Sequence, residues 1–310
     1  MLYPMQIAPI VLFSYNRPWH LAQTVEALRQ NELADLSDLI IYSDGPKNSD
    51  DLLKVEEVRK YIRTIEGFKS IKIINREKNY GLATSIISGV SETIDHYGRI
   101  IVLEDDLVTA PYFLRYLNDG LNYYENEDKV ISIVGYIYPV EGLPETFFIR
   151  GTDCLGWGTW KRGWDLFEAD GEKLLSELKK HKLTKQFDYN GAYPYTKMLG
   201  DQIQGKISSW AIRWHASGFV KGLLTLFPGR SLVMHIGGDG SGTNCQVTDH
   251  LDVQLSNSPV PIGDIPVLEH EGARKKIQRY MLSLRLPFII RLKLFLKRVI
   301  KRVLLGKAKE

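Results

Sequence analysis

The sequence of 310 residues has few cysteines, no long apolar run and little net charge. Two cysteines, Cys154 and Cys245, exclude a disulfide-stabilised scaffold and suit a reducing compartment. No stretch of about 18 apolar residues occurs, so we expect no membrane-spanning helix, and the first residues lack the basic and apolar regions of a signal peptide. The net charge is +3, but residues 288–310 alone carry +7, which leaves −4 for the rest. A nucleic-acid-binding surface over the whole protein is therefore not expected.

Short apolar runs alternate with segments of helical periodicity over the first 134 residues. Buried strands are expected at 10–14, 39–43, 71–74, 100–103 and 130–134. Helices are expected from Pro18 onward, where Leu21, Val25 and Leu28 share one face, and at about 49–65, 82–96 and 111–125. This alternation predicts an α/β fold with an open, mostly parallel sheet and flanking helices.

Three adjacent acids, Glu104, Asp105 and Asp106, follow the apolar strand at 100–103. The carboxyl end of such a strand is where α/β folds bind ligands. Adjacent carboxylates repel one another and resist burial, so a positive group is expected beside them. A divalent metal that holds a phosphorylated ligand is one interpretation, because hard oxygen ligands suit Mg²⁺ or Mn²⁺. A solvated acidic turn is the other.

The middle of the chain changes in character. Residues 155–164 contain three tryptophans and three glycines, and Trp210 and Trp214 follow further on. These tryptophans suit either a platform that stacks on sugars or anchors of a less regular core. The glycine-rich stretch 237–242 can form a phosphate cradle, a mobile lid or a plain flexible loop, and it matches neither a P-loop nor a dinucleotide fingerprint.

Four short blocks follow one another in the first half of the chain. They are Phe13–Arg17, Ser43–Gly45, Lys78–Leu82, and Val102–Leu107 with Ala110 and Pro111 after it. In this order they resemble the GT-A glycosyltransferases, specifically the N-acetylglucosaminyltransferase I type and its bacterial relatives. Glu104-Asp105-Asp106 matches the Glu-Asp-Asp form of that family's DXD motif. The resemblance covers about residues 8–136, and residues 156–160 resemble the acceptor-side segment.

The resemblance implies a nucleotide-sugar donor and a divalent metal, Mn²⁺ or Mg²⁺. Asp106 would coordinate the metal, while Glu104 and Asp105 would contact the sugar or ribose of the donor. Arg17 would neutralise the diphosphate or brace the nucleotide. Two further donor contacts are implied, one from Asp44 to the base and one from Asn79 to the nucleoside. Structural alternatives are a salt bridge from Arg17 to Asp44 and a helix-capping role for Asn79.

An inverting transfer needs a general base to deprotonate the acceptor hydroxyl. In the resembled family an acid shortly before a tryptophan has this role, but here Ser208 and Ser209 precede Trp210. Asp201 is the candidate base, and Asp153 and Asp165 are rivals. The resemblance also predicts a late histidine at the metal or diphosphate. His235, just before the glycine-rich stretch, is the candidate, with a packed structural histidine as the alternative.

The last residues predict a basic amphipathic helix. From Phe288 on, apolar residues gather on one side of the helix and basic residues on the other. This pattern is typical of a helix that lies in an anionic membrane surface. Packing of this helix on the catalytic domain or on a partner subunit is the alternative.

These observations predict a peripheral enzyme on the cytoplasmic face of the membrane. Residues 1–136 would form the nucleotide-sugar-binding half of a GT-A domain, residues 137–260 its acceptor-side half, and residues 261–310 an extension with the amphipathic helix. The expected reaction is metal-dependent, inverting transfer from a UDP-sugar to a glycan or lipid-linked acceptor in surface polysaccharide or lipopolysaccharide assembly, with no nucleic-acid partner. A sugar-nucleotide nucleotidyltransferase and an inactive glycan-binding or scaffold protein are the alternatives.

Overall fold

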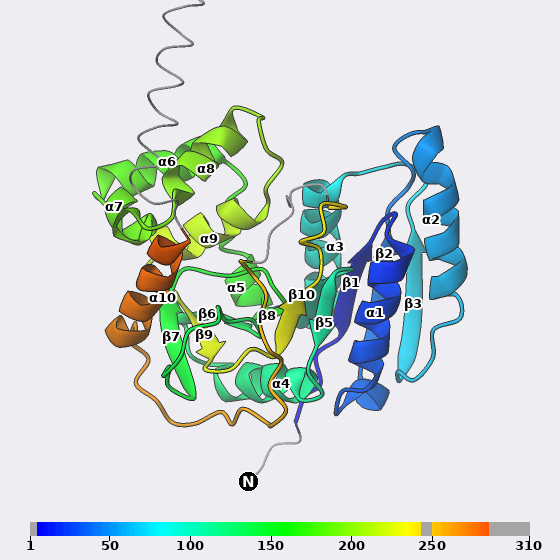
Figure 1. Cartoon of the computed structure of the whole chain (residues 1–310), viewed down its shortest axis with the longest axis horizontal. Helices are drawn as coiled ribbons and strands as arrows, with labels where there is room; N and C mark the ends of the chain where they lie inside the picture. Colours follow the sequence, from blue (N-terminus) through cyan, green and yellow to red (C-terminus); the bar gives the residue numbers. More distant parts are fainter. Residues whose placement is uncertain (1–4, 243–249, 285–310) are drawn as a thin grey trace, which may run out of the picture.

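The computed structural model describes residues 5–242 and 250–284. It contains one eight-stranded sheet with helices around it and a small two-stranded sheet (Figure 1). The strands are β1 (Ile10–Ser14), β2 (Asp38–Ser43), β3 (Ser70–Asn75), β4 (Arg99–Glu104), β5 (Leu107–Thr109), β6 (Val130–Val134), β7 (Thr146–Arg150), β8 (Trp157–Trp160), β9 (Leu224–Pro228) and β10 (Val233–His235). The α-helices are α1 (Pro18–Arg29), α2 (Ser49–Ile62), α3 (Leu82–Tyr97), α4 (Phe113–Tyr123), α5 (Lys161–Trp164), α6 (Gly171–Lys180), α7 (Thr184–Phe187), α8 (Tyr195–Ile203), α9 (Ala211–Val220) and α10 (Glu271–Ser283).

The N-terminal part of the sheet is parallel, as the sequence predicts. The large sheet has the order β3-β2-β1-β4-β8-β6-β9-β7, and its first four strands all run in the same direction. Val11 of β1 lies between Ile40 of β2 and Val102 of β4, and all five residues of β1 are buried. Burial on both faces explains why these strands read as continuous apolar runs. The expected α/β fold class with a mostly parallel sheet is confirmed.

Local sequence signals set the starts of the helices that follow these strands. Pro18 opens α1, and Arg17 occupies the N-cap position without a side-chain capping bond. The Asn48 side chain accepts from the backbone N–H groups of Asp50 and Asp51 at the start of α2. Gly81, with φ +72°, precedes α3. Because strand and helix alternate, the N-termini of α1, α2 and α3 all reach the carboxyl edge of the parallel strands (Figure 1).

The second part of the sheet was only partly predicted. Strand β8, drawn from the tryptophan- and glycine-rich stretch, lies between β4 and β6 and is antiparallel to both. Its Trp157 pairs with Val102 of β4. β9 is parallel to β6, and β7 closes the sheet antiparallel to β9. The predicted boundary at residue 136 therefore follows β6, and one sheet runs through both of the expected halves.

The tryptophans of this region are core residues. Trp157, Trp160, Trp164, Trp210 and Trp214 are each at most 5% exposed. Trp157 lies at the centre of the group, with ring centroids 5.5 Å from Trp214 and 5.6 Å from Trp210. The interpretation as core anchors is confirmed, and the sugar-stacking platform is wrong for these five. Four of them pack on one another, and Arg162 covers the Trp160 ring at 4.2 Å.

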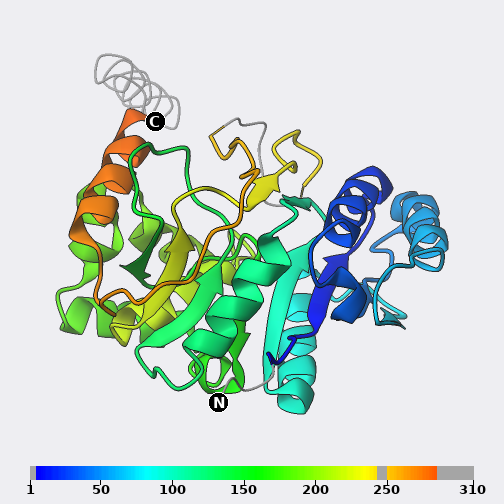
Figure 2. The same cartoon turned by 90° about the horizontal axis from the view of Figure 1, so that it is seen from below.

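Four short helices, α6 to α9, form a cluster with an apolar core of its own beside the large sheet (Figures 1 and 2). Its core side chains are Leu174, Leu178, Phe187, Leu199, Ile212, Ala216 and Phe219. Helix α10 packs against the domain through Ala273, Ile277 and Met281. Within the described residues, no helix combines the length and apolarity needed to cross a bilayer. The expected amphipathic helix after Phe288 lies outside the described residues.

Candidate functional site

The three acids lie at the carboxyl end of β4 and are mostly shielded from solvent. Glu104 is the last residue of β4 and pairs with Phe13 of β1. Asp105 is 4% exposed and Asp106 is 7% exposed. The Thr24 hydroxyl of α1 donates to the backbone oxygen of Asp105 and holds the turn in place. The solvated acidic turn considered above is therefore wrong, and the buried charges need partners.

Arg17 supplies the positive charge from the turn after β1. Its Nη2 atom forms an ion pair with Asp105 and lies 2.9 Å from Asp106 Oδ2. Arg17 Nη1 is buried and has no hydrogen-bond partner among the described residues. The alternative salt bridge from Arg17 to Asp44 does not form: Arg17 pairs with Asp105 and Asp106, and the Asp44 carboxylate accepts from the loop before α3.

The small sheet brings His235 to the same point. β10 pairs with β5 in antiparallel register, so His235 lies opposite Leu107, and the backbone N–H of Ile236 donates to the backbone carbonyl oxygen of Asp106. His235 Nε2 is 3.4 Å from Asp106 Oδ2. The pairing of β10 with β5 thus brings His235 beside Asp106, 129 positions earlier in the sequence. We call the resulting cluster the acid–arginine site. Its members are Arg17, Glu104, Asp105, Asp106 and His235.

Gly237 fits against this cluster because it has no side chain. A Cβ atom at Gly237 would lie 2.2 Å from Asp106 Oδ2 and 2.9 Å from His235 Nε2. The glycine-rich stretch then turns over the start of α1, where Asp239 Oδ2 is 3.2 Å from His20 Nε2. Ser241 donates from its backbone and its hydroxyl to Asp239 Oδ1. The first part of this stretch is therefore an ordered cover over the site.

Neighbouring charges set the pKa values of the three acids in different directions. Burial raises the pKa of Glu104 to about 8, helped by the two aspartates. Burial also raises the pKa of Asp105 to about 6, although Arg17 opposes the shift. Burial would raise the pKa of Asp106 too, but the bonds and charges from His235 and Arg17 outweigh it and lower it to about 2. Asp106 is therefore the acid that stays an anion and suits a cation.

The side chains of Asp106 and His235 suit a divalent metal ion whose remaining ligands come from a substrate. Within the described part of the chain, no group of three or more His, Cys, Asp and Glu side chains is placed to hold a metal by itself. Asp106 and His235 offer one carboxylate oxygen and one imidazole nitrogen 3.4 Å apart. Mg²⁺ in phosphoryl-binding sites commonly has one or two protein ligands beside phosphate oxygens and water. The two side chains fit such a site.

Asp44 lies at the end of β2, and its carboxylate is already occupied. It accepts from the backbone N–H groups of Tyr80 (2.8 Å) and Gly81 (2.9 Å), and from the side chain of Asn79 (3.2 Å). Asn79 also donates to the Gly45 oxygen at 2.8 Å. Asp44 and Asn79 therefore fix the loop before α3, and Gly81, not Asn79, occupies the N-cap position of that helix. Their predicted contacts to a nucleotide stay predictions.

Asp201 is held at the protein surface by two lysines. It lies in α8, forms an ion pair with Lys197, and has Lys206 Nζ 3.7 Å away. The hydrogen bond from Lys197 lowers the pKa of Asp201 further below its ordinary value. A carboxylate engaged in this way is a weak proton acceptor, so the structure disfavours the predicted base. The rival Asp165 is exposed and pairs with Lys161.

Two residues at this edge were not predicted from the sequence. They are His20, described above, and Arg76, whose guanidinium lies 4.2 Å from the centre of the partly exposed Tyr80 ring. Gly237 was predicted only as part of the glycine-rich stretch 237–242. The Tyr80 ring and Arg76 stand beside the loop that Asp44 fixes. A lone arginine or histidine has no spacing signal, whereas Gly237 follows the candidate His235 by two residues.

A known protein family and several solved structures are similar to this chain. The sequence matches the profile of glycosyl transferase family 2 over residues 10–166, just over half of the chain. No curated protein matches the chain. Among solved structures, the chain is similar to TarS of S. aureus, with a TM-score of 0.41 and 10% identity over 75% of this chain and 37% of the TarS chain.

Two further solved structures are similar to parts of the chain. A structure of S. aureus TarS 1-349 has a TM-score of 0.33 and 11% identity, over 56% of this chain and 49% of that one. The mannosyltransferase PcManGT from Pyrobaculum calidifontis, solved with GDP-Man and Mn2+, has a TM-score of 0.32 and 9% identity, over 44% of this chain and 39% of that one. This chain therefore spans less than half the length of each of these proteins.

Proposed function

Because this chain belongs to glycosyl transferase family 2, we propose that it transfers a sugar from a nucleotide diphosphate sugar to a glycan or lipid-linked acceptor with the help of a divalent metal. The observation that carries the proposal is the convergence of Arg17, Asp106 and His235 at the carboxyl end of β4. Glycosyltransferase activity follows from the family, whereas the donor, the metal and the acceptor are proposals.

The acid–arginine site suits a departing diphosphate. Arg17 reaches the acids from the N-terminus of α1, where backbone N–H groups also favour anions. Asp106 and His235 would hold Mn²⁺ or Mg²⁺, and the ion, when bound, supplies Lewis-acid stabilisation of the leaving group. Arg17 now neutralises Asp105 and Asp106, so its guanidinium must turn toward the phosphates when donor and metal arrive. Its buried, unpartnered Nη1 is one donor atom ready for that role.

We assign the neighbouring strand ends to the rest of the donor. Asp44 and Asn79 hold the loop that carries Tyr80, and this loop would face the nucleoside, which we take to be uridine. Glu104 forms no side-chain hydrogen bond or ion pair with the described residues, and together with Asp105 it would contact the donor sugar or ribose. The narrower kinship with the N-acetylglucosaminyltransferase I type, and an inverting outcome, belong to the same proposal.

The acceptor and the place of action are proposed from the sequence. A basic amphipathic helix after Phe288 would hold the enzyme on the inner face of a membrane, next to lipid-linked acceptors in surface polysaccharide or lipopolysaccharide assembly. The division into residues 1–136, 137–260 and 261–310 stays a proposal of the same kind.

A panel of nucleotide sugars tests the proposal. UDP-glucose, UDP-galactose, UDP-N-acetylglucosamine and GDP-mannose are incubated with the full chain, with and without Mn²⁺, and binding is followed by calorimetry and nucleotide release by chromatography. We expect one donor to bind with Mn²⁺-dependent affinity and to be hydrolysed slowly. If no donor binds or releases its nucleotide, either with or without Mn²⁺, the proposal is contradicted. Formation of a sugar nucleotide from a sugar phosphate would favour the nucleotidyltransferase instead.

A further inference from the structure

Another carboxylate, that of the partly buried Asp153, lies in a small pocket close to the start of β8. Asp153 belongs to the segment that leads into β8, and Gly156 of this segment packs so closely against β10 that a Cβ there would lie 2.7 Å from Val233. Trp157 pairs with Val102, two residues before Glu104. The segment therefore approaches the same carboxyl edge as the acid–arginine site, from the side opposite to Arg17.

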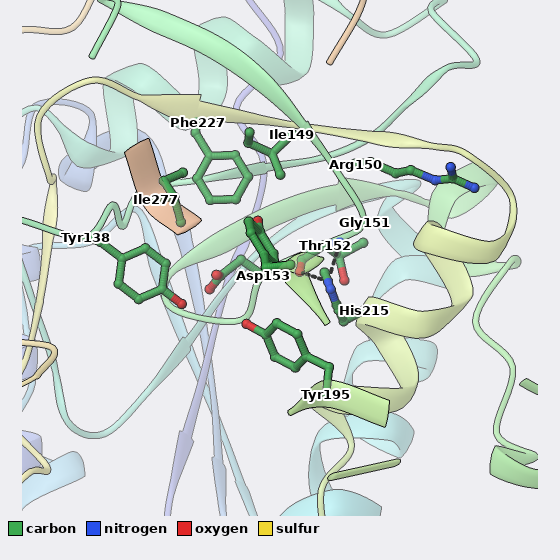
Figure 3. A pocket seen from close by; sticks show the side chains of 11 residues that line it. Tyr138, Ile149, Arg150, Gly151, Thr152, Asp153, Tyr195, His215, Phe227 and Ile277 are labelled. Atoms are coloured by element: carbon green, nitrogen blue, oxygen red, sulfur yellow. Dashed lines mark hydrogen bonds between the residues drawn. The ribbon is translucent and has the colours of Figure 1, made fainter. Parts of the chain in front are cut away.

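Several of the side chains that line the pocket carry polar groups able to form hydrogen bonds (Figure 3). Figure 3 shows the hydroxyl groups of Tyr138 and Tyr195 pointing toward the Asp153 carboxylate from two sides. Asp153 Oδ1 accepts from the backbone N–H groups of Cys154 (2.7 Å) and Leu155 (3.1 Å), whereas Oδ2 accepts no bond from the described residues. One oxygen is thus fixed, and the other is available to a ligand.

Two further polar atoms in the pocket lack partners. His215 Nε2 and Thr152 Oγ1 are buried and form no hydrogen bond with the described part of the chain. His215 is held in place by its Nδ1 atom, 2.7 Å from the Thr152 oxygen, and by stacking on Phe187. Buried polar groups are normally satisfied, so an unpartnered pair beside a carboxylate points to a polar guest.

The wall of the pocket is rigid and strained. Tyr189, 5% exposed, has φ +48°, a value that an aromatic residue rarely adopts. Arg274 of α10 lies 4.2 Å above the Tyr189 ring and is itself paired with Glu269. Backbone strain of this kind persists where the surrounding structure imposes it, and it gathers at ligand sites. The enclosed space measures about 10 Å³. This volume is close to that of one water molecule or one hydroxyl group.

We propose that this pocket receives the attacking hydroxyl of the acceptor and that Asp153 takes its proton. The inference rests on the proposed glycosyl transfer. The acceptor O–H bond breaks and its proton passes to Asp153 Oδ2, while the acceptor oxygen bonds to C1 of the donor sugar. The bond from C1 to the phosphate oxygen breaks, and its electron pair leaves with the nucleoside diphosphate. Tyr138, Tyr195 and His215 would position this hydroxyl. The ligand of the pocket is therefore a sugar or another polyol.

The charges around Asp153 agree with a proton acceptor. Burial raises the pKa of Asp153 above its ordinary value, and no cation from residues 5–242 or 250–284 pairs with it. The surrounding titratable groups are tyrosines, whose pKa values burial raises, and His215, whose pKa burial lowers to about 4. The tyrosines are Tyr136, Tyr138, Tyr189 and Tyr195. Arg150 also lines the pocket. None of the tyrosines titrates near neutral pH. Glu104 and Asp105 of the acid–arginine site have raised pKa values of their own, so the acidic limb that belongs to Asp153 is the one that responds to substitution of Asp153.

Donor hydrolysis tests this inference without knowledge of the natural acceptor, because water then occupies the pocket. The full chain and Asp153→Asn are compared with UDP-glucose, UDP-galactose and UDP-N-acetylglucosamine in Mn²⁺. We expect kcat to fall about 10²–10⁴-fold in Asp153→Asn. Nucleotide affinity and melting temperature should stay close to those of the unchanged chain. Asp119→Asn, at a partly exposed aspartate that pairs with Arg115, is the matched control and should keep its rate.

A second variant separates a proton acceptor from a structural group. Asp153→Glu keeps the carboxylate and should recover part of kcat, and the acidic limb of its kcat–pH profile should move, whereas Asp153→Asn should lose that limb. Rates within threefold of the unchanged chain in both variants would overturn the inference, and the pocket would then hold only a structural water. If the unchanged chain neither binds nor hydrolyses any donor, the proposed function fails instead, so the two failures are distinguishable.

Discussion

Asp106 and Asp153 approach the same edge of the sheet, yet their surroundings are opposite. Asp106 has Arg17 and His235 beside it, and these lower its pKa to about 2 in spite of burial. Asp153 has two backbone N–H groups and a ring of tyrosines, and burial raises its pKa. The same type of side chain is therefore a fixed anion at Asp106 and, as we propose, a proton acceptor at Asp153.

The two places also differ in how they are built. The acid–arginine site uses the ends of β1 and β4 and is closed by the backbone of β10. The Asp153 pocket combines residues of β7 and β9 with side chains from α8, α9 and α10 and from the segments after β6 and before β8. The first is positioned by the sheet alone, whereas the second also depends on helices and loops, which can differ between acceptors.

Loss of the Asp106 carboxylate should have the largest effect. Asp106→Ala removes the anion that would hold the metal, so we expect metal-dependent turnover to fall at least about 10³-fold. The fold should remain, because Arg17 keeps its partner Asp105. Asp119→Ala, at a partly exposed ion pair with Arg115, is the control. Nucleotide release measures the turnover, and melting curves measure the stability of the fold. Retained metal-dependent turnover in Asp106→Ala would show that Asp106 does not hold the metal.

Weaker donor binding is expected when the strand-end contacts are removed. Arg17→Ala and Asp44→Ala should each lose about 1.5–3 kcal/mol of nucleotide affinity, as for a hydrogen bond to a charged group. Arg17 would lose a phosphate contact, and Asp44 would release the loop at Tyr80 and Gly81. Calorimetry measures the change, with Arg29→Ala on an exposed part of α1 as the control. Unchanged affinity in both variants would refute this map of the donor site.

His215 should make stability depend on pH. Its folded pKa, about 4, lies below the ordinary value of 6.5 because it is buried, so the unfolded chain binds the proton first as the pH falls. Its contribution is neutral above pH 6.5 and becomes destabilising between pH 6.5 and 4, by about 2 kcal/mol at pH 5.

Urea unfolding at pH 7 and pH 5 tests this prediction. His215→Phe should reduce the loss of stability between the two pH values relative to the unchanged chain. Acids with raised pKa values, Asp153 among them, shift stability in the other direction as the pH falls and are common to both proteins. An equal pH dependence in the two would show that His215 is not held neutral in the pocket.

A single methyl group at Gly237 should affect the acid–arginine site alone. Gly237→Ala would place its Cβ against Asp106 and His235, so we expect Mn²⁺ affinity and kcat to fall about tenfold. Gly200→Ala is the matched control, because a Cβ there meets nothing within 4 Å and lies in helix α8. Calorimetry with Mn²⁺ and UDP measures the change. Full affinity in Gly237→Ala would mean that the stretch moves away when the metal binds.

Removal of residues 288–310 should leave the acid–arginine site and the Asp153 pocket unchanged. A chain that ends at Pro287 should keep its melting temperature and donor hydrolysis but lose binding to anionic vesicles, and the binding of the full chain should weaken with added salt. Co-sedimentation and melting curves on the same protein measure these effects. A sharp loss of stability with unchanged vesicle binding would show instead that this segment packs on the domain.

The first half of the fold could be predicted because each element there follows local rules. Strands β1, β2, β4 and β6 are buried apolar runs, and the helix starts carry Pro18, Asn48 and Gly81. The second half could not be predicted in this way. Strand β8 consists of Trp, Gly and Thr, whose pattern is equally that of an irregular core, and only its pairing with β4 and β6 makes it a strand.

The sequence alone determined that Glu104, Asp105 and Asp106 end a buried strand, since an apolar run followed by acids has few other structures in an α/β chain. Only the tertiary structure decided which acid stays an anion, because His235 and Gly237 reach Asp106 through the pairing of β10 with β5, far along the chain. The same holds for Asp153, whose surroundings come from separate elements. Local sequence fixes where a carboxylate stands, and the charges that come near it through space fix what it can do.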